Sequence, residues 1–179
     1  MTGLQVLPAQ TNQHSRGRAS CVLALCLTLT ACSTNQTADV TVISGAVTKV
    51  HDGDSIHITP ANQKRQVIRL AGIDAPELKQ ANGIASRDKL RSLLTGRNAK
   101  AHCHKIDRYK RHVCTVFLDE TDIGLTMVQA GYAWHYTDYQ SEQTPSQRRQ
   151  YKRAQVKSMR AENGIWSQAS PIPPWEFRQ

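Results

Sequence analysis

Five short β-rich stretches, each bounded by turn residues, constrain the fold of this chain more than any other feature. They cover residues 40–50, 55–59, 66–73, 99–106 and 112–118. Alternating or continuous apolar residues over such lengths predict strands. Helical spacing and capping signals predict three helices, over residues 85–94, 122–130 and 145–162. Five strands with helices inserted late predict an α+β domain, mainly β, built on a five-stranded closed barrel of the OB type.

Composition narrows the class of protein further. The chain has 179 residues, a length typical of one domain with a substantial core. With 39% hydrophobic and 21% charged residues, it is unlike a disordered chain. The sequence holds no apolar run long enough for an ordinary transmembrane helix. The formal net charge of +9 favours a polyanionic partner, either nucleic acid or an anionic membrane surface, and a merely solvated basic surface is the alternative.

The first part of the chain has the pattern of a targeting segment. An apolar stretch over residues 21–31 is too short to span a bilayer but typical of a signal-peptide core. It ends in Leu29-Thr30-Ala31-Cys32, which resembles the bacterial lipobox, where the cysteine is diacylated and becomes the new N-terminus. We therefore expect a lipoprotein signal peptide over residues 1–31, lipidation of Cys32 and a polar tether over residues 32–41. A buried N-terminal helix is the alternative.

This segment predicts a location in the bacterial cell envelope. We expect a lipid-anchored protein on the periplasmic or surface face, otherwise a secreted one, and Ser33 after the lipid cysteine favours the outer membrane. Residues 1–31 carry Arg16 and Arg18 and no acidic residue, so removing them leaves a net charge of +7. A tail rich in proline and tryptophan occupies residues 169–179, and its prolines predict that residues 171–175 are not helical.

The cysteines of the remaining chain predict a disulfide. With Cys32 lipidated, Cys103 and Cys114 form an even number outside the cytoplasm, which favours one bridge. A hairpin turn centred between Arg108 and Tyr109 would place these two cysteines opposite each other on neighbouring strands. A metal site that combines them with His102 and His104 is the alternative, but Cys103 points to the other face of its strand than the histidines do.

Three short segments concentrate residues suited to chemistry. The first, Asp52-Gly53-Asp54-Ser55, places two carboxylates around a glycine between two strands. Such carboxylates can present oxygens to a hard cation. An EF-hand is excluded because its later ligands and glutamate are absent, and a plain surface turn is the alternative.

The second segment runs from Arg69 to Glu77. Arg69 lies inside an apolar strand, where a guanidinium is costly without an anion. Strand alternation predicts Arg69 on one face and Asp74 on the other. Pro76 would end the strand so that Asp74 and Glu77 leave it at the same rim, although Glu77 could simply be an acidic residue at a helix start.

The third segment is the predicted hairpin tip, residues 107–111. Its cations suit phosphate, and Tyr109 can stack on a base. A charged hairpin tip is otherwise a solvated surface.

Taken in order, these segments resemble the staphylococcal nuclease (thermonuclease) family. The family pattern joins an Asp-Gly-Asp-Thr turn, an Arg-Leu-x-Gly-x-Asp-x-Pro-Glu strand end, an Asp-x-Tyr-Gly-Arg turn and a Gly-x-Ala segment. This chain carries, in the same order, Asp52 to Ser55, Arg69 to Glu77, Asp107 to Arg111 and Gly131 to Ala133. The resemblance identifies residues 42–168 as a staphylococcal-nuclease-like domain with an OB fold.

The resemblance implies a calcium-dependent endonuclease that hydrolyses phosphodiester bonds of DNA, RNA or both. Asp54 and Asp74, with the backbone carbonyl of Ala75, would bind Ca²⁺. An oxygen-only ligand set suits calcium, and no His/Cys set at this rim argues for zinc. We expect a monomer with nucleic acid as its substrate.

The same resemblance assigns residues to the substrate. Arg69 and Arg111 would hold the phosphate, and Glu77 would act as the general base for the attacking water or orient it. The residues expected to contact the nucleotide are all tyrosines: Tyr109, Tyr136 and Tyr139. Lys110 departs from the family because it replaces the glycine before the arginine. Arg111 is therefore well placed only if this lysine adopts the backbone conformation that the turn needs.

Two other functions compete with this prediction. One is a catalytically silent OB-fold module that binds nucleic acid. The joint presence of Asp54, Arg69, Asp74, Glu77 and Arg111 argues against it. The other is a non-enzymatic envelope lipoprotein whose basic surface binds anionic lipid or glycan, in which case membrane binding would not depend on these five residues.

Overall fold

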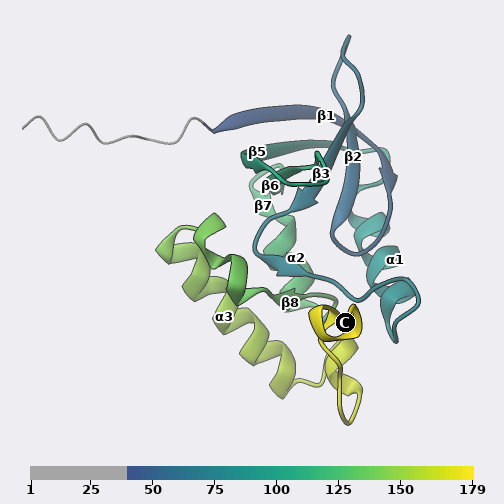
Figure 1. The fold of residues 1–179 in the computed structure, drawn as a ribbon, viewed down its shortest axis with the longest axis vertical. Coiled ribbons are helices and arrows are strands. Elements are labelled where there is room, and N and C mark those ends of the chain that lie inside the picture. Colours follow the sequence, from purple (N-terminus) through teal and green to yellow (C-terminus); the bar gives the residue numbers. More distant parts are fainter. Residues whose placement is uncertain (1–39) are drawn as a thin grey trace, which may run out of the picture. The chain divides into compact units, whose positions relative to one another are not determined.

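The computed structural model of this protein describes residues 40–179 (Figure 1). The predicted signal peptide over residues 1–31, the lipidation site Cys32 and most of the predicted tether lie outside these residues. Strand β1, Thr41–Val50, includes Thr41, so the last residue of the predicted tether belongs to the barrel instead. Within residues 40–179, no helix combines the length and the apolar character needed to cross a membrane.

Five strands close into a barrel, as the sequence predicts. They are β1, β2 (Ser55–Thr59), β3 (Gln66–Leu70), β5 (Asn98–Ile106) and β6 (His112–Leu118). Antiparallel pairing runs from β3 through β2, β1 and β5 to β6, and a parallel pairing of β3 with β6 closes the ring. The fold is therefore the α+β, five-stranded OB-type barrel expected from the strand pattern.

Helices and short strands surround this barrel. The helices are α1 (Gly83–Leu94), α2 (Ile123–Gln129), α3 (Pro145–Arg160) and α4 (Pro174–Phe177), with 3-10 turns η1 (Thr137–Glu142) and η2 (Gly164–Ser167). The short strands are β4 (Ile73–Asp74), β7 (Thr121–Asp122) and β8 (Trp134–His135). Figure 1 shows α2, α3 and the C-terminal segment below the barrel, with β8 between them.

Capping residues explain where α2 and α3 begin. Asp122 accepts a hydrogen bond from the Leu125 N–H and caps α2, as predicted. Thr144 and Gln147 form a capping box at the start of α3, and Pro145 occupies its first turn. The hydroxyl of the buried Tyr151 on α3 donates to the Asp122 carboxylate at 2.8 Å, so this cap also joins the two helices.

The core lies inside the barrel and extends under the helices. Branched aliphatic side chains dominate it. All five barrel strands contribute, and alternate positions of β2 and β3 supply four of its largest fully buried side chains: Ile56, Ile58, Ile68 and Leu70. Leu90 and Leu94 of α1 and Met127 of α2 cover one side of the same cluster. Burial of this kind is the main stabilising contribution in a domain with so few phenylalanines.

Two expectations about local structure are wrong. The predicted strand 66–73 is split into β3 and β4 by a turn at Ala71 and Gly72, where Gly72 has a φ of 68°. The predicted non-helical tail contains α4, because a proline at the first helical position needs no N–H partner and already has the helical φ. The prolines therefore start this short helix rather than prevent it.

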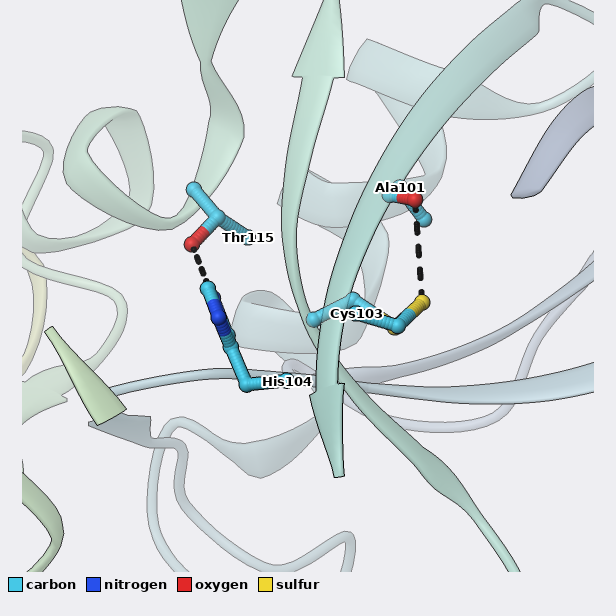
Figure 2. Close-up of a disulfide and its surroundings, with 5 residues drawn as sticks. Ala101, Cys103, His104 and Thr115 are labelled. Carbon is cyan, nitrogen blue, oxygen red and sulfur yellow. Dashed lines mark hydrogen bonds between the residues drawn. A yellow bond between two sulfur atoms is a disulfide. The ribbon is translucent and has the colours of Figure 1, made fainter. Parts of the chain in front are cut away.

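A disulfide joins β5 and β6. Cys103 and Cys114 are directly paired across the two strands, which confirms the predicted register at this point, and their sulfurs are bonded (Figure 2). Both cysteines are buried. The next residue, His104, has its ring 3.2 Å from the Thr115 hydroxyl. The sulfurs are not available as thiolates, so the alternative metal site at these strands is left without two of its ligands.

Candidate active site

A cavity of about 620 Å³ lies between the tip of the β5–β6 hairpin, the loop around β4 and the C-terminal segment. It is lined by every residue to which the sequence assigns a catalytic, metal-binding or nucleotide-binding role: Asp54, Arg69, Asp74, Ala75, Glu77, Tyr109, Arg111, Tyr136 and Tyr139. The fold therefore gathers in one place residues that come from five separate parts of the chain.

The loop before β2 and the strand β4 bring two aspartates together. Asp54 is 6% exposed and Asp74 is 2% exposed. The Asp54 carboxylate accepts hydrogen bonds from the backbone N–H of Ala75 at 2.9 Å and from the Ser55 hydroxyl at 3.0 Å. Gly53 lets the loop approach Ser86 and Ala75 so closely that a Cβ would clash. The backbone that follows Asp74 thus fixes the carboxylate of Asp54.

Arg69 joins these two carboxylates. Its Nε lies 3.3 Å from Asp54 Oδ1, and its Nη2 lies 3.0 Å from Asp74 Oδ1. Its Nη1 donates to the Leu70 carbonyl at 2.7 Å. Burial alone would lower the pKa of Arg69, but the two aspartates raise it overall and hold the guanidinium charged. The sequence predicts that a guanidinium in this apolar strand needs an anionic partner. Asp54 and Asp74 together provide it.

The expected separation of Arg69 and Asp74 onto opposite faces is wrong. Strand alternation holds only along an uninterrupted strand. The turn at Ala71 and Gly72 ends β3 and interrupts the alternation of side chains between the two faces. Asp74 therefore lies on the same side as Arg69 and contacts it.

A third aspartate, Asp52, also lines the cavity. Asp52 accepts a hydrogen bond from the N–H of Asp54 at 3.0 Å. Burial, and then the neighbouring charge of Asp54, raise the pKa of Asp52 to about 7. Burial also raises the pKa of Asp74, although its hydrogen bond with Arg178 and the charge of Arg69 oppose this. Carboxylates with raised pKa values gain from a further cation nearby.

Asp107 shapes the hairpin that carries Arg111. Its Oδ1 accepts the N–H groups of Tyr109 and Arg111, each at 2.9 Å, and its Oδ2 accepts from Arg111 Nε at 2.8 Å. Lys110 adopts a φ of 62°, the conformation for which glycine is usual. Arg111 nevertheless lines the cavity, with Nη1 3.4 Å from the Ser55 hydroxyl.

The three predicted tyrosines all line the cavity. Tyr109 is 63% exposed at the hairpin tip, where the Arg111 guanidinium lies 5.3 Å from its ring centre. Tyr136 and Tyr139, at the start of η1, have ring centres 4.9 Å apart. Aromatic rings beside cations are suited to stacking against nucleic-acid bases.

The cavity is also lined by charged residues to which the family resemblance assigned no role. Among them are Asp52, Lys105, Glu142 and Arg178. Of these four, the sequence indicated only Asp52, as one of the two carboxylates of the Asp-Gly-Asp turn. Lys105 and Glu142 pair with each other at 2.7 Å across the cavity wall. Arg178 lies more than a hundred positions from its partners Asp74 and Glu77, so no local sequence pattern could have indicated it.

Comparisons with known proteins identify the family to which this protein belongs. The staphylococcal nuclease homologue family matches residues 67–168. A protein named as an uncharacterized endonuclease of Escherichia coli O157:H7 is 37% identical over 141 residues, which cover 76% of this chain and 85% of the relative. A micrococcal nuclease of Shigella flexneri is 32% identical over 144 residues, which cover 75% of this chain and 80% of the relative. The protein therefore belongs to the family of staphylococcal nuclease homologues.

Proposed function

We propose that the protein is a calcium-dependent endonuclease that hydrolyses phosphodiester bonds of DNA, RNA or both. Family membership supports the nuclease activity, and similar proteins bear the names endonuclease and micrococcal nuclease. The observation that carries the proposal is the single cavity in which two buried aspartates, two arginines and Glu77 meet. Calcium and the individual roles below are what the proposal adds to family membership.

Asp54, Asp74 and the Ala75 carbonyl would hold the cation. The fit rests on two buried carboxylates that already share one cationic group, the Arg69 guanidinium, and on a purely oxygen donor set, which Ca²⁺ prefers. Among residues 40–179, no cluster of three or more His, Cys, Asp or Glu side chains could hold a metal ion. Water and a substrate phosphate would therefore complete the coordination. When bound, the cation offsets the charge that gathers on the phosphate oxygens.

Arg69 and Arg111 would hold the scissile phosphate from two directions. Arg69 approaches from the end of β3, and Arg111 approaches from the hairpin tip. Both are held in place, Arg69 by aspartates and Arg111 by Asp107. A positioned guanidinium can donate two parallel hydrogen bonds to phosphate and stabilise negative charge as it develops.

Glu77 would take the proton from the attacking water. It leaves the chain just after Pro76, at the same rim as Asp74, and its side chain is 38% exposed, which leaves it open to water. A carboxylate there must be ionised to act as a base. Tyr109, Tyr136 and Tyr139 would stack against the nucleotide from the cavity wall.

Digestion of single-stranded DNA and of RNA by the purified protein, with Ca²⁺ or with a chelator, tests the activity. We expect cleavage with Ca²⁺ only. Glu77→Gln should lower turnover more than it weakens substrate binding, because it keeps the shape and removes the base. Arg97→Gln is the control, since Arg97 is exposed in the turn between α1 and β5 and does not line the cavity. Binding without cleavage would identify a silent OB-fold module instead.

We also propose that the protein is anchored in the bacterial envelope through a lipid on Cys32. The lipobox-like sequence Leu29 to Cys32 supports this. A metabolic acyl label should appear on the parent protein and be absent from Cys32→Ala, which should also be released or mislocalised. An acyl label that persists on Cys32→Ala would refute the assignment, and binding to anionic vesicles that ignores the cavity residues would favour a non-enzymatic lipoprotein.

A further inference from the structure

Through Arg178, the C-terminal segment, residues 169–179, reaches the cavity that the proposed function uses. The Gln80 side-chain amide donates to the Ile172 carbonyl at 2.5 Å, and Pro174 is buried at the start of α4. Figure 1 shows this segment, in yellow, turning back beside β8. The segment therefore has its own anchors on the domain, and its last residues are directed to the cavity.

Arg178 of this segment binds the carboxylates proposed for the cation and the water. Its Nη2 lies 2.8 Å from Asp74 Oδ2, and its Nη1 lies 3.3 Å from Asp74 Oδ1 and 2.8 Å from Glu77 Oε1. Arg69 contacts Asp74 Oδ1 as well. Both oxygens of Asp74 are thus engaged by guanidinium groups, and Glu77 is tied to the same side chain.

Trp175 covers the stacking surface in the same way. Its ring lies 5.0 Å from that of Tyr136, with an angle of 11° between the planes. This is a stacked arrangement, the one in which a nucleotide base would meet the tyrosine. The segment therefore places a cation on the carboxylates of the cavity and a flat ring on Tyr136, a residue that lines it. These are the two kinds of group that a metal-bound nucleotide would bring.

We propose that the C-terminal segment is an autoinhibitory strap, in which Arg178 competes with the divalent cation for Asp74 and Trp175 competes with a base for Tyr136. The inference rests on the proposed function, because it concerns the regulation of the same site. Arg69 and Arg178 already occupy both oxygens of Asp74, so a cation that binds this carboxylate must displace a guanidinium group from it. Arg178 is the more exposed of the two and is therefore the one that leaves. Cation binding then favours molecules in which the strap is released. The apparent affinity for the cation equals the intrinsic affinity multiplied by the fraction of molecules with a released strap.

The strap is suited to release. The Arg178 side chain is 42% exposed, and Phe177 beside it is 43% exposed. Helix α4 has only four residues, and its Trp175 contacts Tyr136 and lies 6.4 Å from the ring of Trp134. Arg178 directly follows the helix and is the residue of the segment that lines the cavity. A segment with few buried contacts opens at a lower free energy than the barrel does.

Calcium titration of the purified full chain by calorimetry tests the competition. Arg178→Gln should bind Ca²⁺ about tenfold more tightly, if a tenth of the parent molecules have the strap released. Lys105→Gln is the matched control, because it also removes one positive charge from the cavity. The Lys105 side chain pairs with Glu142 and not with Asp74 or Glu77. The affinity of this variant should stay much closer to that of the parent. Asp74→Asn should abolish binding in either background.

Tryptophan fluorescence provides the second measurement. Ca²⁺ should shift the parent's emission toward that of solvent-exposed tryptophan, as Trp175 leaves Tyr136, and Trp175→Phe should lose this shift. Equal calcium affinities of the parent and Arg178→Gln, both dependent on Asp74, would overturn the strap and leave the proposed function standing. An affinity gain of the same size in Lys105→Gln would also overturn it. If neither the parent nor Arg178→Gln binds Ca²⁺ through Asp74, both the strap and the proposed calcium site are refuted.

Discussion

At the scale of single residues, the side chains of the cavity are held by charge as much as by packing. Only 14% of the Arg69 side chain is exposed, and its partners are the two aspartates proposed as cation ligands. Its guanidinium contacts Asp54, Asp74 and the Leu70 carbonyl with three different nitrogens. Only a planar fork of donors can reach three acceptors in this way.

Arg69→Lys should therefore keep the charge and lose much of the activity. An ammonium cannot reproduce the fork, and we expect a loss of about 2–4 kcal/mol of transition-state stabilisation, the size of a lost oxyanion donor. The measurement is kcat/KM on single-stranded DNA across a calcium titration, with circular dichroism to check that the variant is folded. Cleavage at the parent's rate would show that Arg69 does not bind the scissile phosphate.

The backbone conformation of Lys110 depends on its neighbours as well as on its own residue type. The sequence raises the question of whether a lysine can stand where the turn calls for glycine. It does so, with a φ of 62°, because Asp107 accepts the N–H groups on either side of it and holds the turn from within. The strain of the left-handed conformation is of the order of 1 kcal/mol, which the charge-assisted hydrogen bonds of Asp107 can offset.

At the scale of elements, the five barrel strands and three longer helices could be predicted because their signals are local. Alternation, turn residues and caps lie within a few positions of one another, as Asp122 and Thr144 illustrate. The split between β3 and β4 could not be predicted from the apolar pattern. Leu70 to Ile73 is apolar throughout, and the turn at Gly72 depends on tertiary contacts with η1 and the residue after it.

The β5–β6 hairpin carries the disulfide, and its removal should weaken the barrel. A closed loop of this size predicts a loss of about 2–3 kcal/mol in the free energy of unfolding for the Cys103→Ala, Cys114→Ala double variant. Urea unfolding of the double variant and of the parent, the latter with and without reductant, measures this difference. Mass spectrometry of non-reduced, periplasm-derived protein should find no free thiol, and two free thiols there would refute the bridge.

The β1–β2 hairpin should make stability depend on pH. His57 on β2 is buried, and its Nε2 lies 2.6 Å from that of His51. Burial, and then the positive charges of His51, Arg65 and Lys49, lower the pKa of His57 to about 4 from its ordinary value of 6.5. Between these two values the unfolded chain takes up a proton that the folded chain does not. Stability from this histidine is therefore present above pH 6.5 and is lost as the pH falls toward 4.

His57→Gln should flatten that dependence, because glutamine does not titrate. Urea unfolding of the parent and the variant between about pH 4 and pH 8 gives the two slopes. The difference between them isolates His57 from the acidic residues, which titrate in both proteins. Identical slopes would show that His57 is protonated as readily in the folded protein as in the unfolded chain.

At the scale of the whole molecule, positive charge is spread beyond the cavity. Helix α3 carries five exposed cations: Arg149, Lys152, Arg153, Lys157 and Arg160. Within residues 40–179 none of them forms a salt bridge. Unpaired cations on one helix can bind phosphates away from the scissile bond. Arg178 contacts Asp74 and Glu77 only because the folded chain brings together residues more than a hundred positions apart. Contacts of this kind could not be predicted from the sequence.

Nucleic-acid binding should weaken steeply as salt rises. The measurement is the Kd of Glu77→Gln for single-stranded DNA between low and physiological salt. Replacing the five exposed α3 cations by glutamine should reduce the slope of log K against log salt by about 0.7 for each phosphate that the helix no longer neutralises. A parent slope near zero would mean that the net charge is unrelated to the substrate.

The parallel pairing of β3 with β6 has a consequence for the rate and order of folding. It joins residue 68 to residue 112, across the whole of α1 and β5. Closing so long a loop is slow, because its entropy is lost before the pairing is gained. Arg69 and Arg111 come from the two sides of this closure, so a refolding chain can form its antiparallel hairpins early and still lack a phosphate site. Recovery of activity should therefore follow the slow closing phase rather than the first appearance of β-structure.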